Sequence, residues 1–261
     1  MSLQRSCRRA WAGSSLRAGC GCAAADTACA RVVEAILDAI RRTPTRGEAM
    51  KLDAQNVQDA ASRTLQHYEK RAEDFRQGTQ GHDVSQNISA LLQHIEGAPP
   101  FAILDLGCGP GRDLKAFVEL GHSPIGLDGS ARFAAMAREG GFEVWEQNFL
   151  ALDLPENRFH GIFANASLFH VPSQELPRVL SELHATLRPR GVLFSSNPHG
   201  HNEEGWSGGR YGAYHDLENW RRFMGEANFG ELAHYYRPAG LPREQQPWLA
   251  SVWRKEARSH R

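Results

Sequence analysis

The stretch Phe101-Ala-Ile-Leu-Asp-Leu-Gly-Cys-Gly-Pro-Gly111 decides the fold of this 261-residue chain. It opens with a short apolar run, which is typical of a strand buried on both faces of a parallel sheet. Three glycines follow at once, at alternate positions 107, 109 and 111. A glycine-rich turn between a strand and a helix lets the backbone approach a ligand at the carboxyl end of the strand. The stretch therefore predicts an α/β domain with a ligand site beside this strand.

Helical and strand patterns alternate on both sides of this turn. Two helices, at 54–77 and 84–96, are expected to precede it as an N-terminal helical cap. The strands are predicted at 101–106, 124–128, 142–145, 159–164, 191–196, 231–237 and 248–254. Further helices are predicted at 112–120, 130–139, 174–187 and 216–227. This alternation predicts a Rossmann-like, seven-stranded, mostly parallel sheet with helices on both faces.

One connection is unusually long. Residues 197–214 are polar and contain five glycines, too long a segment for an ordinary link between a strand and a helix. Long loops on such scaffolds commonly carry function. We therefore expect a functional loop or lid here.

The charge of the chain is zero overall but unevenly distributed. Residues 1–51 hold nine Arg or Lys against four acids, so the remaining 210 residues carry 21 basic and 26 acidic groups. A net charge of −5 on the body disfavours a protein that binds by neutralising phosphates, so nucleic acid is not expected as a partner.

The head of the chain differs from the body. The first 25 residues contain four Arg and no acid, a composition typical of an organelle transit peptide. Residues 1–50 are therefore interpreted as a transit-peptide-like or disordered leader, and residues 51–261 as the domain. The expected location is a mitochondrion or plastid, with the cytoplasm as the alternative. The sequence contains no run of about 18 apolar residues, so no membrane-spanning helix is predicted. Cys20-Gly-Cys22 lacks the spacing of a zinc site, so no metal is expected.

The glycine spacing distinguishes between classes of ligand. Dinucleotide folds place their third glycine where this chain has Arg112, and no Gly-Lys-Ser/Thr follows as in a phosphate-binding loop. Asp105, which opens the turn, would repel a diphosphate but would attract ammonium and sulfonium charges.

The segment Ile103–Gly111 resembles the first motif of the class I S-adenosylmethionine-dependent methyltransferases, and the resemblance covers about residues 60–254. It implies S-adenosyl-L-methionine as the cofactor, bound at a turn formed by Asp105, Gly107, Gly109 and Gly111. It also implies that Asp128, 17 residues after Gly111, holds the ribose hydroxyls. The alternative for Asp128 is a helix N-cap.

The same resemblance implies further cofactor contacts. Asn148 and Phe149 match the pair that contacts adenine, and Asn165 matches the segment that lines the methionine half. Tyr68 resembles residues that close over the methionine end, although a role in the core is the alternative. The sequence after Asn165 is not the Asn/Asp-Pro-Pro-Tyr/Phe motif of methyltransferases that act on nucleic-acid or glutamine amino groups.

The resemblance implies an in-line displacement at the sulfonium methyl, in which the protein mainly aligns the reactants and excludes water. A base is optional, because an acceptor can arrive already ionised. The catalytic candidates are His170, Tyr211, Tyr214 and His215. For His170, packing or hydrogen bonding within the fold is the alternative.

We therefore expect methyl transfer to a small-molecule O, N or S nucleophile, by an enzyme similar to the branch with quinone-biosynthesis and tellurite-resistance type members. An organellar RNA or protein methyltransferase is one alternative. A methyltransferase-like assembly factor without catalysis is the other. The sequence leaves the acceptor and the oligomeric state open.

Overall fold

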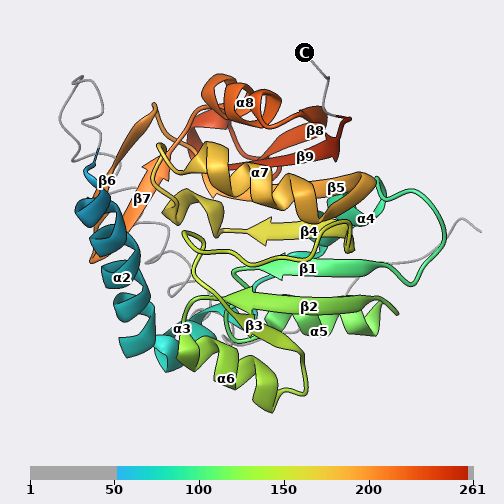
Figure 1. Ribbon diagram of the computed structural model, residues 1–261, viewed down its shortest axis with the longest axis horizontal. Coiled ribbons are helices and arrows are strands. Elements are labelled where there is room, and N and C mark those ends of the chain that lie inside the picture. Colours follow the sequence, from blue (N-terminus) through green and yellow to red (C-terminus); the bar gives the residue numbers. More distant parts are fainter. Residues whose placement is uncertain (1–51, 258–261) are drawn as a thin grey trace, which may run out of the picture.

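A seven-stranded sheet forms the centre of the computed structural model, which describes residues 52–257 (Figure 1). Its strands lie in the order β3-β2-β1-β4-β5-β9-β8. Their bounds are Ala102–Leu106 for β1, Ser123–Asp128 for β2, Val144–Glu146 for β3, Phe159–Asn165 for β4, Leu187–Pro198 for β5, Phe229–Arg237 for β8 and Trp248–Lys255 for β9. Strands β1 to β5 are parallel, whereas β9 is antiparallel to both β5 and β8. The predicted fold class is confirmed, and the carboxyl ends of β1, β2 and β4 meet at one edge.

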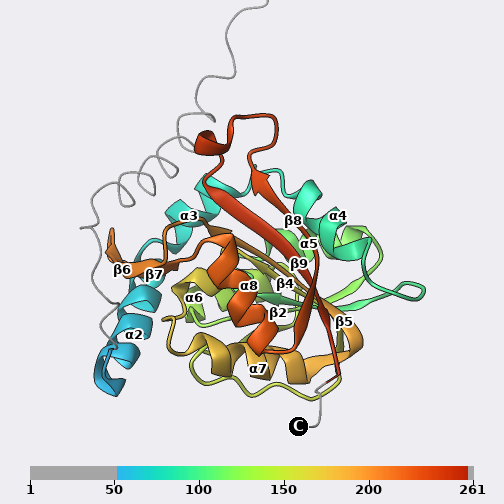
Figure 2. The ribbon, with the colours of Figure 1, turned by 90° about the horizontal axis from the view of Figure 1, so that it is seen from above.

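Helices cover both faces of the sheet (Figure 2). Their bounds are Ala54–Lys70 for α2, Ala72–Thr79 for α3, Ser85–Leu92 for α4, Arg112–Glu119 for α5, Ala131–Glu139 for α6, Leu176–Thr186 for α7 and Leu217–Glu226 for α8. The apolar stripes of α7 and α8 pack on one face, and those of α4 and α5 pack on the other. Leu180 and Leu183 of α7, for example, are fully buried at helical spacing.

The first expected helix is two helices. Helix α2 begins after Asp53, whose carboxylate accepts the Asn56 N–H at 2.8 Å, and it ends at Lys70. Arg71, with φ −120° and ψ 18°, leaves the helical region before α3 begins. The apolar spacing continues from Tyr68 to Phe75 through this break, which is why the pattern predicts a single helix.

The expected long loop is largely a β-hairpin. Strands β6 (Glu203–Ser207) and β7 (Arg210–Tyr214) form a separate two-stranded antiparallel sheet, which lies against α2. Gly208 and Gly209 connect them with φ of 55° and 86°. Two consecutive positive φ values define the tight hairpin turn that Gly-Gly favours. The segment expected to be a functional loop or lid thus contains a regular hairpin over residues 203–214.

Residues 1–50, which are predicted to be a transit-peptide-like or disordered leader, lie outside the described residues. The predicted location in a mitochondrion or plastid depends on these residues. Within residues 52–257, no helix is both long and apolar enough to cross a membrane.

Candidate functional site

The glycine-rich turn after β1 has the strained geometry that its sequence predicts. Gly107, Gly109 and Gly111 have φ of 78°, 53° and 92°, a region that other residues rarely adopt. A Cβ on Gly107 would also lie 2.5 Å from the Cβ of Ser167. The N–H groups of Gly107 and Cys108 donate to the carbonyl of Leu127, at 2.7 and 3.1 Å. The turn is therefore pinned to the end of β2, and only glycine fits at position 107.

Asp128, at the end of β2, is bound to this turn. One carboxylate oxygen accepts the N–H of Gly109 at 2.9 Å, and the other accepts the N–H of Ser130 at 2.9 Å. The residue that caps α6 is Ser130, whose hydroxyl accepts the Phe133 N–H at 3.2 Å, so the N-cap alternative for Asp128 is wrong. A carboxylate has about four acceptor positions, which leaves Asp128 capacity for ligand hydroxyls.

Asp105 lies beneath the turn. It is 1% exposed, and its Oδ2 has no hydrogen-bond partner among residues 52–257. Burial raises the pKa of its carboxyl well above the ordinary range, and the nearby Asp113 raises it further. The raised pKa favours the neutral carboxyl, and Asp105 lies beneath the turn, outside the cavity wall.

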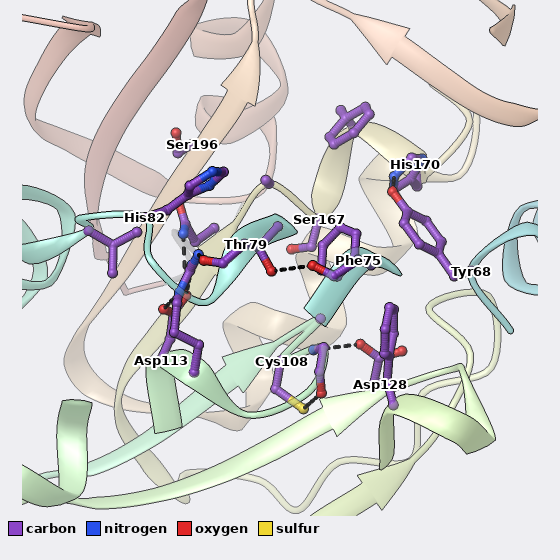
Figure 3. A pocket seen from close by; sticks show the side chains of 18 of the residues that line it. Tyr68, Phe75, Thr79, His82, Cys108, Asp113, Asp128, Ser167, His170 and Ser196 are labelled. Carbon is purple, nitrogen blue, oxygen red and sulfur yellow. Dashed lines mark hydrogen bonds and ion pairs between the residues drawn. The ribbon is translucent and has the colours of Figure 1, made fainter. Parts of the chain in front are cut away.

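A cavity of about 1230 Å³ opens above the turn (Figure 3). Its walls include the predicted cofactor residues Tyr68, Gly107, Gly109, Asp128, Asn148, Phe149 and Asn165, together with the predicted catalytic residue His170. Sites for one drug-sized ligand usually measure about 300–1,000 Å³. This cavity therefore has room for a cofactor and a second molecule.

The other predicted site residues lie outside the cavity wall. Asp105 and Gly111 support the turn from below, and Gly111 packs against Ala137. Tyr211 is buried in the hairpin, and Tyr214 lies beside Phe169, with 6.2 Å between ring centres. His215 borders a small separate void next to Trp220, where burial lowers its pKa to about 4. The structure thus does not bring Tyr211, Tyr214 and His215 into the cavity with His170.

His170 is held by hydrogen bonds on both ring nitrogens. Its Nδ1 lies 2.6 Å from the carbonyl oxygen of Tyr211, so Nδ1 carries the proton and donates it. Its Nε2 therefore accepts the hydroxyl of Tyr68 at 2.8 Å, and Arg210 donates to that hydroxyl at 3.2 Å. Burial lowers the pKa of His170 to about 3, which keeps the ring neutral. Its role as a general base remains a prediction, and a proton would have to reach Nε2 through Tyr68.

Other polar residues of the cavity are not evident from the sequence. Asp113 forms a two-point ion pair with Arg112, at 2.6 and 2.9 Å, and accepts a hydrogen bond from Asn165 at 3.3 Å. Asn165 in turn accepts from the side-chain amide of Asn87 at 2.9 Å. His82 lies across the cavity from Tyr68 and His170 (Figure 3). Of these additional polar residues, only Arg112 stood out in the sequence, because it occupies the position of the third glycine of a dinucleotide fold.

Comparisons with known proteins agree with this geometry. Residues 103–191 match the model of a methyltransferase domain. Trans-aconitate 2-methyltransferase of Azoarcus sp. (strain BH72) is 36% identical over 116 residues, which are 43% of this chain and 45% of that protein. Malonyl-[acyl-carrier protein] O-methyltransferase of Enterobacter lignolyticus (strain SCF1) is 28% identical over 144 residues, 54% of this chain and 53% of that protein. The chain thus spans about half the length of these relatives.

The fold has a solved counterpart in the 1,6-didemethyltoxoflavin-N1-methyltransferase of Burkholderia thailandensis, whose structure contains 1,6-didemethyltoxoflavin and S-adenosylhomocysteine. The TM-score is 0.67 at 21% identity, and the match covers 82% of this chain and 95% of that one. The chain therefore shares the fold of this methyltransferase, and residues 103–191 are similar to a methyltransferase domain.

The described residues fit S-adenosylmethionine as the cofactor. Gly109 lines the cavity, and a Cβ there would meet only Phe75, at 3.6 Å, so the backbone is open to close approach. Asp128 has acceptor capacity for ribose hydroxyls. Asn148 already accepts the N–H of Leu150 at 3.0 Å, and its oxygen has a second lone pair for adenine. Within residues 52–257, no cluster of three His, Cys, Asp or Glu side chains could hold a metal.

Proposed function

We propose that this protein transfers a methyl group from S-adenosylmethionine to a small-molecule nucleophile. The observation that carries the proposal is the glycine turn with Asp128 bound to it, facing a cavity large enough for two molecules. When bound, the cofactor supplies an already activated methyl group. Asp128 and the backbone of the turn would bind and orient it. The apolar and aromatic walls, including Phe149 and Phe169, would exclude water.

Support for a small acceptor comes from the cavity and from two of the similar proteins. One relative is named for trans-aconitate, and the structural neighbour contains 1,6-didemethyltoxoflavin. The other relative is named for malonyl-acyl carrier protein, whose acyl group is carried by a protein. The proposed nucleophile is an O, N or S atom of the acceptor. A likeness to quinone-biosynthesis and tellurite-resistance type enzymes is proposed as well. An organelle location, through residues 1–50, is proposed on composition alone.

Thermal denaturation with S-adenosylhomocysteine tests cofactor binding. Ligand at about 100 times its dissociation constant should stabilise the protein by roughly 2.7 kcal/mol. For a domain of this size, that corresponds to a rise in Tm of about 5–10 °C. NAD, which carries a diphosphate, is the control and should give no shift. No shift with S-adenosylhomocysteine, or an equal shift with NAD, would refute the proposal and favour a scaffold without cofactor.

Cofactor affinity should fall in acid. Burial raises the pKa of Asp128 from 3.8 to about 6, and the nearby Glu69 contributes to the rise. Since the ionised carboxylate is the better acceptor for ribose hydroxyls, S-adenosylhomocysteine should bind about tenfold more weakly at pH 5 than at pH 7. The free protein should show the opposite trend, because a raised acid pKa makes Asp128 lower the folding stability as pH rises from about 4 to 6.

Calorimetric titration at several pH values checks this dependence, with Asp128→Asn as the matched control. The Asn side chain keeps the shape and has no ionisable group, so its weaker binding should vary less with pH. An equal pH dependence in both proteins would assign the effect to another group.

A further inference from the structure

Arg210 lies on the hairpin side of the cavity. It is the first residue of β7, it lines the cavity, and its guanidinium donates to the hydroxyl of Tyr68 at 3.2 Å. Tyr68 in turn is hydrogen-bonded to His170. Arg210 therefore approaches the cavity from the hairpin, an element distinct from the glycine turn and Asp128.

The charge of Arg210 has no acidic partner within the part of the chain that the structure describes: no carboxylate there lies within 4.0 Å of it. The two acids of its own hairpin are engaged elsewhere. Glu203 accepts the N–H of His201 at 2.6 Å, and Glu204 accepts the N–H of Ser173 at 2.8 Å. Arg112, by contrast, is paired with Asp113. Arg210 is only half-buried, so its guanidinium keeps donors for a ligand in the cavity besides the one given to Tyr68.

The surroundings of Arg210 are aromatic and uncharged. Burial lowers the pKa of His67 and His170, and the Arg210 charge lowers both further. Burial raises the pKa of Tyr68 and Tyr214, and Arg210 acts against that rise. All four groups are therefore neutral near pH 7, and none of them cancels the positive charge.

The acids of the cavity wall are placed on other elements. Asp113 is paired with Arg112, Asp128 is bound to the glycine turn, and Asp83 accepts the N–H of Ser85 at the start of α4. The fourth, Glu244, belongs to the exposed turn before β9. The hairpin side of the cavity thus carries the charge of Arg210 with no acid of the wall on the same element, and Arg237, at the end of β8, is a further arginine of the wall.

We propose that Arg210 binds a carboxylate on the methyl acceptor, so that the substrates of this enzyme are small carboxylic acids. The inference rests on the proposed function and specifies its substrate class. A guanidinium matches a planar carboxylate with two parallel hydrogen bonds, and such charge-assisted pairs are about twice as strong as neutral ones. A single arginine balances the single charge of a carboxylate. Arg210 acts here as a specificity-determining residue.

The test uses the full-length protein, methyl-labelled S-adenosylmethionine and a metabolite extract separated on an anion-exchange resin. We expect the extract to accept label in the fraction that the resin retains. Treatment of that fraction with alkaline phosphatase should leave the activity intact, because the recognised anion is a carboxylate. With the acceptor purified from this fraction, Arg210→Gln should raise KM by about 10–100-fold.

Two variants and one binding measurement complete the design. Arg210→Lys keeps a point charge and should recover part of the lost affinity. Arg63→Gln is the matched control, because Arg63 is exposed on α2, outside the cavity wall, and stacks over Trp206 at 4.0 Å. It should behave as the wild type. S-adenosylhomocysteine should bind Arg210→Gln within about twofold of the wild type, since Arg210 serves the acceptor.

Four results would overturn the inference while leaving the proposed function intact: acceptor activity in the unretained fraction, loss of activity after phosphatase, equal KM values for Arg210→Gln and Arg63→Gln, or a parallel loss of S-adenosylhomocysteine binding in Arg210→Gln. The last would assign Arg210 to the cofactor's own carboxylate. A wild-type protein that binds no S-adenosylhomocysteine, or labels nothing in any fraction, would overturn the proposed function and the inference with it.

Discussion

Replacement of Gly107 by Ala should destabilise the domain and abolish binding of S-adenosylhomocysteine. The new Cβ would lie 2.5 Å from the Cβ of Ser167, in a backbone conformation with φ of 78°. The unfavourable φ costs about 1–3 kcal/mol, and overpacking costs a similar amount. We therefore expect the free energy of unfolding to fall by about 2–5 kcal/mol. Denaturant titration and calorimetry measure the two effects.

Two further variants separate the causes. Gly225→Ala, in α8, is the control, because a Cβ there meets nothing within 4 Å and φ is ordinary. It should leave stability unchanged or slightly raised. Gly107→Ala combined with Ser167→Gly removes the clash and should regain only the steric part of the loss. A stable Gly107→Ala protein with normal affinity would show that this turn is not the cofactor cradle.

Replacement of Asp128 by Ala should weaken binding of S-adenosylhomocysteine by about 100-fold or more, while the domain remains folded. A hydrogen bond to a charged group contributes about 1.5–3 kcal/mol, and Asp128 is assigned two ribose hydroxyls. The fold should lose less, because burial disfavours the charged carboxylate and partly offsets its bonds to Gly109 and Ser130. Calorimetric titration measures the affinity for S-adenosylhomocysteine, and circular dichroism shows whether the variant is folded. Unchanged affinity would defeat the assignment of Asp128 to the cofactor.

The centre of the sheet was predictable because β1, β4 and β5 each contain a separate, buried apolar run. The run at Phe101–Leu106, the acid at 128 and the spacing of the glycines were enough to place the cofactor end of the site. These signals are local in sequence, and the topology of a parallel sheet brings them together without further information.

The acceptor end was less predictable, since its contacts join distant residues. The hydrogen bond between Tyr68 and His170 spans 102 positions, and the one between Asn87 and Tyr235 spans 148. The hairpin was missed for another reason. Glycines at 205, 208, 209 and 212 are typical of an irregular loop, whereas the structure uses two of them for a tight turn. Tyr211, Tyr214 and His215 were grouped by proximity in the sequence. Tyr211 and Tyr214 fall on opposite faces of β7, and His215 follows the strand.

The β6–β7 hairpin pairs only with itself and is inserted between β5 and α8, apart from the main sheet. Residues 211–213 of the hairpin are buried, whereas Arg210 is its one residue that lines the cavity. Under the proposed function, a change at this position could alter the acceptor while the strands that carry the glycine turn stay unchanged. Among proteins related to this one, the residue at position 210 should then vary with the charge of the methyl acceptor.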